Sequence, residues 1–510
     1  ITTSGGALTF GNGETNTSGF LVGGDVYFNS STAQTLSTNG GDLAVHGETL
    51  LANQHGLTVN TSGGDITFDA SINSANQYNF VSGYRTWTNA RANATSANGA
   101  LSDTDVGYSH LVAINSRLEN SVAGIISGYA GAWLGAYRDK DNALGNGANA
   151  WYWADAPENT QPFFIQGGEG TSFYNNFASG EPNGIGTGGE WAGQFFGTEG
   201  KWNDLRPNSV QTGAYGVTGY VKETNLAASN ITINSGAGII TFTGDIGTSK
   251  AIGTLDITST SDVTLYGTIT TQNTQIYDAA VNLANDTVLT TTHSDIIFKS
   301  TVDSLDALDP KHLTTNINTG KVQFNANVGS TAKVGDVDIN GSMQTAANIS
   351  AVNSIDVTGV ASIGGDVTSA LNQNYQSAVK LTSNSVLTTT NNGNITTTTT
   401  IDGAHNLTVS TNGTGDTTIA GAIGATTQLK NVTITTDAVA LNSISVEDSA
   451  AINISNSSES TISDVINGTD VTLSKDGTGT LILTGNNTYT GDSAISNGTL
   501  AVTAAAGLGT

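Results

Sequence analysis

Short, self-similar runs of alternating apolar and polar residues fill most of this 510-residue chain. Runs such as "DITFDA", "IITFTGDIG" and "DVTLYGTI" have the two-residue period of a β-strand and are separated by Gly, Asn, Asp or Ser. Longer stretches also recur, since "YDAAVNLANDTVLTTT" from Tyr277 aligns with "YQSAVKLTSNSVLTTT" from Tyr375. Repeats of this kind indicate a solenoid, in which stacked coils build a continuous core that no single coil could form.

We therefore expect a mainly β fold, a parallel β-helix of roughly 20–25 residues per coil, on the repeat lengths of such folds. Thr and Asn suit the outward positions of the coils, where they can form ladders. The alternative is a disordered linker, because Gly, Ser and Thr abound. Apolar alternation along the whole repeat argues against disorder.

One segment, residues 76–224, departs from this pattern. It contains all six tryptophans, all five arginines and four of the five prolines of the chain. This clustering predicts a separate domain, inserted between a solenoid part at 1–75 and a second solenoid part at 225–510. The flanking sequences "GGDITFDASIN" and "NITINSGAGIITF" are both solenoid-like. We therefore expect the β-helix to be continuous in space across the insertion.

Charge and composition limit the possible partners. The formal net charge is −26, so a nucleic acid would be repelled. There is no cysteine and hence no disulfide, and no apolar run is long enough to span a bilayer. Only 11 % of the residues are charged, which suits an extracellular medium where Ca²⁺ is available. Because the chain starts at Ile1 without a signal peptide, we interpret it as a piece of a longer exported protein.

The solenoid is similar to bacterial surface adhesins of the autotransporter-passenger and filamentous-haemagglutinin type. The clearest match is "GTGTLILTGNNTYTGDSAISNGTLAV" at 477–502, which resembles the autotransporter-associated repeat. The resemblance implies an extracellular location or one on the bacterial outer surface.

The inserted segment resembles a C-type lectin-like domain along nearly all of its length. The matching motifs follow in order: "YNFVSG", "TWTNARANATSANG", "HLVAINSRLENSVAGII", "AWLGAY", "WYWAD", "EPN", "WND" and "YGVTGYVKE". The resemblance implies an α+β domain with two helices and a long loop region. Members of the family usually contain disulfides, so here an aromatic core would have to hold the fold.

Two of these motifs, Glu-Pro-Asn at 181–183 and Trp-Asn-Asp at 202–204, are the ligand motifs of that family. Pro182 can adopt a cis bond, which turns the side chains on either side of it in one direction. Ca²⁺ takes about six to eight oxygen ligands, and two neighbouring sugar hydroxyls would complete its shell. The Glu-Pro-Asn order resembles the mannose-type motif, whereas the galactose type reads Gln-Pro-Asp. The resemblance implies that five residues both hold Ca²⁺ and bind the carbohydrate: Glu181, Asn183, Glu190, Asn203 and Asp204.

Other interpretations of these residues stay open. Trp202 is expected in the core whether or not metal binds, and Pro182 could be a simple loop proline. The acidic turn at 139–147, "DKDNALGNG", could hold a second Ca²⁺. It lacks the spacing of an EF-hand loop, however, so a solvated loop is favoured.

We predict an adhesin whose solenoid stalk displays a Ca²⁺-dependent domain that binds a mannose-type glycan on a cell surface or in an extracellular polysaccharide. The alternative is a structural filament or surface-layer subunit, in which the lectin-like domain mediates assembly or protein contacts. We expect no enzyme, because the solenoid has no arginine and its histidines and lysines are scattered. A carboxylate pair brought together only by folding is the exception left open.

Overall fold

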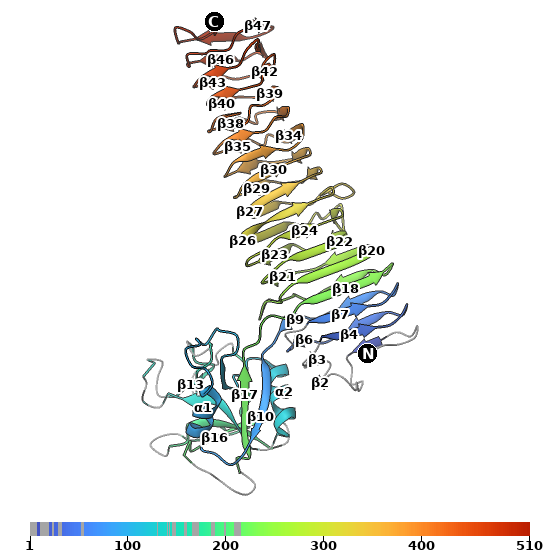
Figure 1. Cartoon of the computed structure of the whole chain (residues 1–510), viewed down its shortest axis with the longest axis vertical. Helices are drawn as coiled ribbons and strands as arrows, with labels where there is room; N and C mark the ends of the chain where they lie inside the picture. Colours follow the sequence, from blue (N-terminus) through green and yellow to red (C-terminus); the bar gives the residue numbers. More distant parts are fainter. Residues whose placement is uncertain are drawn as a thin grey trace.

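The computed structural model describes residues 8–10, 20–22, 25–28, 33–52, 56–129, 131–139, 141, 143–144, 149–157, 161–165, 173–184, 189–197, 200–208 and 216–509. Figure 1 shows a long rod of stacked strands, with a second body beside its N-terminal end. Both helices of the described residues belong to this second body. Among the described residues, neither helix has the length and hydropathy that a membrane-spanning segment requires.

The rod is a parallel β-solenoid of about 20 turns, which confirms the predicted β-helix. Strands in successive coils pair in parallel, residue for residue, and paired residues lie 18 to 25 positions apart in the later coils. One such series consists of β27 (Val337–Thr345), β29 (Ile355–Val357), β32 (Gln373–Tyr375), β35 (Ile395–Thr397), β38 (Thr417–Ile419) and β40 (Val439–Leu441).

The core of the rod follows from strand alternation. In β22 (Gln275–Leu283) every second residue is buried, as expected when successive side chains point to opposite faces. Buried aromatic rings stack from coil to coil: the ring centroids of Tyr277 and Phe298 are 5.0 Å apart, and those of Phe298 and Phe324 are 5.3 Å apart. The apolar residues of successive coils thus form one continuous column.

Polar ladders run along the turns of the rod. The backbone N–H of Asn394 donates to Oδ1 of Asn372 one coil earlier, at 2.9 Å. Asn394 Oδ1 in turn accepts from the N–H of Asp416 at 2.8 Å, and Asp416 Oδ1 accepts from the N–H of Ala438 at 3.0 Å. Each side chain therefore satisfies a backbone donor of the next coil. The ladders expected from Asn are present, with Asp in the same role.

The rod is continuous across the insertion, as predicted. β7 (Leu57–Asn60) pairs in parallel with β18 (Ile231–Gly236), and β8 (Ile66–Phe68) pairs in parallel with β19 (Ile240–Phe242). The last coil before the second body and the first coil after it are therefore direct neighbours in one stack.

The second body, called the inserted domain below, has its own sheet, whose first and last strands lie side by side (Figure 1). Residues Gln77 to Ser82 pair antiparallel with Thr224 to Gly219, so the chain enters and leaves the domain at the same place. Trp87, Ala90 and Ala94 form the buried face of the first helix. The elements are β10 (Gln77–Ser82), α1 (Trp87–Thr95), β11 (Ser109–Leu111), α2 (Arg117–Ser127), β12 (Ala132–Arg138), β13 (Ala150–Trp153), β14 (Phe164–Ile165), β15 (Ala192–Phe196), β16 (Lys201–Leu205) and β17 (Gly219–Thr224).

The inserted domain shares a hydrophobic core with the outer face of the rod. In β6 (Thr49–Leu51), Leu51 points into the core of the rod, whereas Leu50 belongs to the core of the domain. Tyr27 of β3 (Asp25–Phe28) also joins the domain core, and its ring lies 6.1 Å from that of Tyr78. The domain is thus packed against the first coils as well as joined to them.

Candidate functional site

The two predicted ligand motifs meet at the hairpin of β15 and β16. Trp202 anchors this hairpin, because its side chain is fully buried and its Nε1–H donates to Asn120 Oδ1 at 2.7 Å. Its ring makes edge contacts with Trp153, Phe163 and Phe177. The expectation that Trp202 is a core residue is confirmed. The hairpin lies on the side of the inserted domain that is remote from the rod (Figure 1).

Asp204 joins the two motifs by hydrogen bonds. It follows Trp202 on β16 and is buried, as is Asn203. One carboxylate oxygen of Asp204 accepts the N–H of Asn183 at 3.0 Å, and the other accepts the N–H of Gly184 at 2.9 Å. Residues 20 and 21 positions apart in the sequence are thereby held together.

The Glu181–Pro182 peptide bond is cis. The carboxylate of Glu181 accepts hydrogen bonds from the side chain of Asn183 at 2.9 Å and from its backbone N–H at 3.1 Å. Burial, a hydrogen bond with Asp204, and the negative charges of Asp204 and Glu190 raise the pKa of Glu181 to about 7. Two carboxylates in such contact need either a shared proton or a cation between them.

Gly184 lies against both Glu190 and Asp204. A Cβ atom at Gly184 would lie 2.5 Å from the Cβ of Glu190 and 2.8 Å from Asp204 Oδ2. Only glycine fits at this position, because any side chain would displace Glu190 or Asp204. The sequence motif ends at Asn183, so it did not single out this glycine. Residues 185–188 of the same loop lie outside the described residues.

The donor atoms of this site fit a calcium ion. All five predicted ligands carry side-chain oxygens, which hard cations such as Ca²⁺ prefer. Opposite Asn203 on the hairpin, Gln194 is buried and its Oε1 has no hydrogen-bond partner among the described residues. This spare acceptor was not foreseen from the sequence. In the described part of the chain, His, Cys, Asp and Glu side chains alone form no group of three that could hold a metal, so the amides of Asn183 and Asn203 would have to contribute.

The acidic turn that begins at Asp139 has a structural role. The carboxylate of Asp139 accepts the backbone N–H groups of Ala143 at 2.9 Å and Leu144 at 2.8 Å. These hydrogen bonds are those of a turn and support the favoured interpretation of a loop without a metal. Residues 140, 142 and 145–147 of this turn lie outside the described residues, so the alternative of a second Ca²⁺ site stays open.

Comparison with known families finds one match, in the last coils of the rod. Residues 473–502 match the family described as Passenger-associated-transport-repeat. They cover most of β45 (Thr472–Asp476) and all of β46 (Thr480–Leu483), β47 (Ser493–Ile495) and β48 (Thr499–Val502). Together with the solenoid, this match indicates an autotransporter-type, adhesin-like β-helical protein that is secreted or exposed at the surface. No curated protein matches the chain.

Among solved structures, C-type lectins resemble part of the chain. The cow C-type carbohydrate-recognition domain of CD23, determined in the presence of GlcNAc2Man3 oligosaccharide, is 25% identical; the match covers 30% of this chain and 91% of that one, with a TM-score of 0.22. The C-type lectin CEL-I from Cucumaria echinata is 24% identical over 30% and 92% of the two chains, with a TM-score of 0.21. The EPNH mutant of CEL-I is 26% identical, with the same coverage and a TM-score of 0.22. TM-scores this low carry no argument about the function of this chain.

Proposed function

We propose that this protein is an adhesin in which the β-solenoid displays a Ca²⁺-dependent, carbohydrate-binding domain. The observation that carries the proposal is the meeting of the two ligand motifs at Asp204, whose carboxylate accepts both the Asn183 and the Gly184 N–H. A solenoid by itself specifies no ligand, so the function is argued from this site.

Ca²⁺ would relieve the electrostatic cost of the site. Like charges about 4 Å apart repel by roughly 1 kcal/mol in water and by more where solvent is excluded. The carboxylates of Glu181 and Asp204 are in contact, and the negative charge of Glu190 also raises the pKa of Glu181. A dication bound by these three acids and by the amide oxygens of Asn183 and Asn203 would let all three stay ionised.

The sugar would be recognised through two neighbouring hydroxyl groups. A bound Ca²⁺ ion would supply coordination to the hydroxyl oxygens. The surrounding carboxylates accept hydrogen bonds from the same hydroxyls, and the amides of Asn183 and Asn203 can also donate. The Glu-Pro-Asn order supports a mannose-type ligand. We propose binding without turnover, on a cell-surface glycan or an extracellular polysaccharide.

Calorimetric titration of the full chain with Ca²⁺ tests the metal site. The wild-type chain should release or take up heat on binding one ion, and the Glu190→Gln, Asp204→Asn double variant should not. Asp141→Asn is the matched control, because it removes an acid of the other loop and should leave the heat unchanged. Equal heats for the wild type and the double variant would overturn the metal assignment.

The ligand is tested separately on a glycan array, with and without a calcium chelator. Binding should vanish with the chelator, and free mannose should compete much better than free galactose. Galactose competing as well as mannose would refute the mannose-type assignment. Binding that persists in the chelator would refute the dependence on Ca²⁺.

A further inference from the structure

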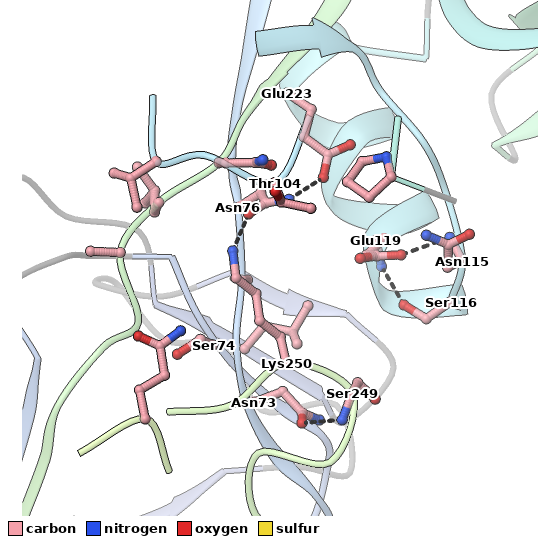
Figure 2. Close-up of a pocket in the computed structure, with 18 of the residues that line it drawn as sticks. Asn73, Ser74, Asn76, Thr104, Asn115, Ser116, Glu119, Glu223, Ser249 and Lys250 are labelled. Atoms are coloured by element: carbon pink, nitrogen blue, oxygen red, sulfur yellow. Dashed lines mark hydrogen bonds between the residues drawn. The ribbon is translucent and has the colours of Figure 1, made fainter. Parts of the chain in front are cut away.

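A cavity of about 410 Å³ lies where the inserted domain joins the rod (Figure 2). It is lined by the segment through which the chain enters the domain, by the segment through which it leaves, and by the turn before β20 (Leu255–Leu265). Each of these three segments contributes one polar side chain to a connected row: Asn76, Glu223 and Lys250.

The three side chains contact one another in a fixed order. Lys250 Nζ donates to Asn76 Oδ1, and Asn76 Nδ2 donates to Glu223 Oε1 at 2.7 Å, as Figure 2 shows. The other carboxylate oxygen of Glu223 accepts the backbone N–H of Ala113 at 2.9 Å. Glu223 is only 4 % exposed. The amine of Lys250 is thus held against the carboxamide of Asn76, and the nitrogen of that carboxamide is hydrogen-bonded to the buried carboxylate of Glu223.

The backbone on both sides of this contact is also held in place. Ser74 donates its N–H to the carbonyl of Lys250 at 3.1 Å, and the Ser249 N–H donates to Asn73 Oδ1 at 3.0 Å. Tyr27 Oη donates to the carbonyl oxygen of Asn76 at 3.3 Å. Reacting groups that the fold holds in contact react far faster than the same groups free in solution.

We propose that Lys250 and Asn76 form an intramolecular isopeptide bond, with Glu223 as the catalytic acid and base. The nitrogen Nζ of Lys250 attacks Cγ of Asn76, so that the Nζ–Cγ bond forms and the Cγ–Nδ2 bond breaks. Nζ starts as an ammonium group and gives up two protons, which Glu223 relays to the departing nitrogen. That nitrogen leaves as an ammonium ion, and Glu223 ends as the carboxylate it was. Atoms and charge balance, and no oxidant is needed.

The chain contains an internal comparison for the role of the carboxylate. Lys201 Nζ also donates to an asparagine, Asn176 Oδ1, at 2.7 Å. The nitrogen of Asn176, however, donates to the carbonyl of Gly200 at 2.7 Å. A carbonyl oxygen cannot relay a proton to a leaving group as a carboxylate can. No bond is therefore expected between Lys201 and Asn176.

The bond would do for this chain what a disulfide does in others. The chain has no cysteine, and Asn76 and Lys250 are 174 positions apart in the sequence. Joining them would enclose the whole inserted domain in a covalent loop, which restricts the unfolded chain. It would also fix the point at which a pulling force on a bound ligand passes into the rod.

Mass spectrometry of the purified full chain, unfolded in denaturant, tests the proposal. The intact mass should be lower than the sequence mass by one ammonia, and digestion should yield a branched peptide that joins Asn76 to Lys250. An intact mass equal to the sequence mass, with the two peptides recovered separately, would overturn the proposal. Loss of ammonia without the branched peptide would overturn it as well.

Variants separate this bond from other losses of ammonia. Lys250→Arg keeps the positive charge but lacks the nucleophile, so its mass should equal its sequence mass. Lys201→Arg, the matched control, should show the same loss of ammonia as the wild type. A folded Glu223→Gln chain should remain unlinked; if it forms the branched peptide at the wild-type rate, the assigned role of Glu223 is wrong.

Discussion

At the scale of single residues, the candidate site depends on one position that has no side chain. Gly184 fits between Asp204 and Glu190, where a Cβ atom would overlap both residues. Trp202 on β16 anchors the hairpin of β15 and β16 through its buried ring. The ligand residues are thus placed by two residues that would not touch the ion themselves.

Gly184→Ala should weaken Ca²⁺ binding by about tenfold, which corresponds to about 1.4 kcal/mol. The added methyl group would overlap Glu190 and Asp204 and would separate the two carboxylates. Calorimetric titration gives the affinity, and thermal unfolding of the same variant serves as the control, since the core around Trp202 is untouched. Unchanged affinity would mean that Glu190 is not part of the site.

At the scale of elements, the rod is held together by contacts that recur between neighbouring coils. Tyr277, Phe298 and Phe324 stack in the interior. In the turns, the side chains of Asn372 and Asn394 accept hydrogen bonds from backbone N–H groups of the next coil, those of Asn394 and Asp416. Each coil makes its stabilising contacts mainly with the two coils next to it. A substitution should therefore change stability mainly in its own coil and in those two neighbours.

Asn394→Ala should lower the free energy of unfolding by about 1 kcal/mol, because the N–H of Asp416 loses its acceptor. Asn394→Asp keeps an acceptor oxygen and should be close to neutral. Denaturant unfolding compares the two variants, and hydrogen exchange should show faster exchange at Asp416 in the alanine variant only. Equal destabilisation by both variants would contradict the ladder as the cause.

At the scale of the whole molecule, the inserted domain and the rod depend on each other at one interface. Tyr27 and Leu50 stand on the outer face of the first coils, and they are buried only because the domain covers them. Strand β16, which carries Asn203 and Asp204, lies on the side of the domain that is remote from the rod, so the rod would present it outward (Figure 1). The packed interface gives the domain a defined orientation on the rod.

Deleting residues 76–224 and joining the ends with a short Gly-Ser turn should leave a folded rod, because β7 and β18 already pair directly. The bared surface of Tyr27 and Leu50 should make this rod associate. Hydrogen exchange should be faster in β3 and β6 and unchanged beyond β20. Polar residues in place of Tyr27 and Leu50 should prevent the association. Loss of protection along the whole rod would show that it needs the domain to fold.

The sequence by itself determined the repeating architecture and the place of the insertion. Strand alternation and turn residues are local, so the β-helix could be predicted from runs such as "DVTLYGTI". The clustering of tryptophan and arginine marked the insertion in the same way. The Glu-Pro-Asn and Trp-Asn-Asp motifs pointed to the candidate site through resemblance, and their five ligand positions stay a prediction.

Only the tertiary structure decided which distant residues meet. Nothing in the sequence spacing shows that Asn76 contacts Lys250, 174 residues away, or that both connect to Glu223. That contact arises because the two ends of the inserted domain return to the same coil, where β10 pairs with β17. Likewise, only the folded domain shows that Gly184 lies against Glu190 and Asp204. Local patterns specify strands and turns, whereas the stacking of coils and the packing of the domain on them bring remote side chains together.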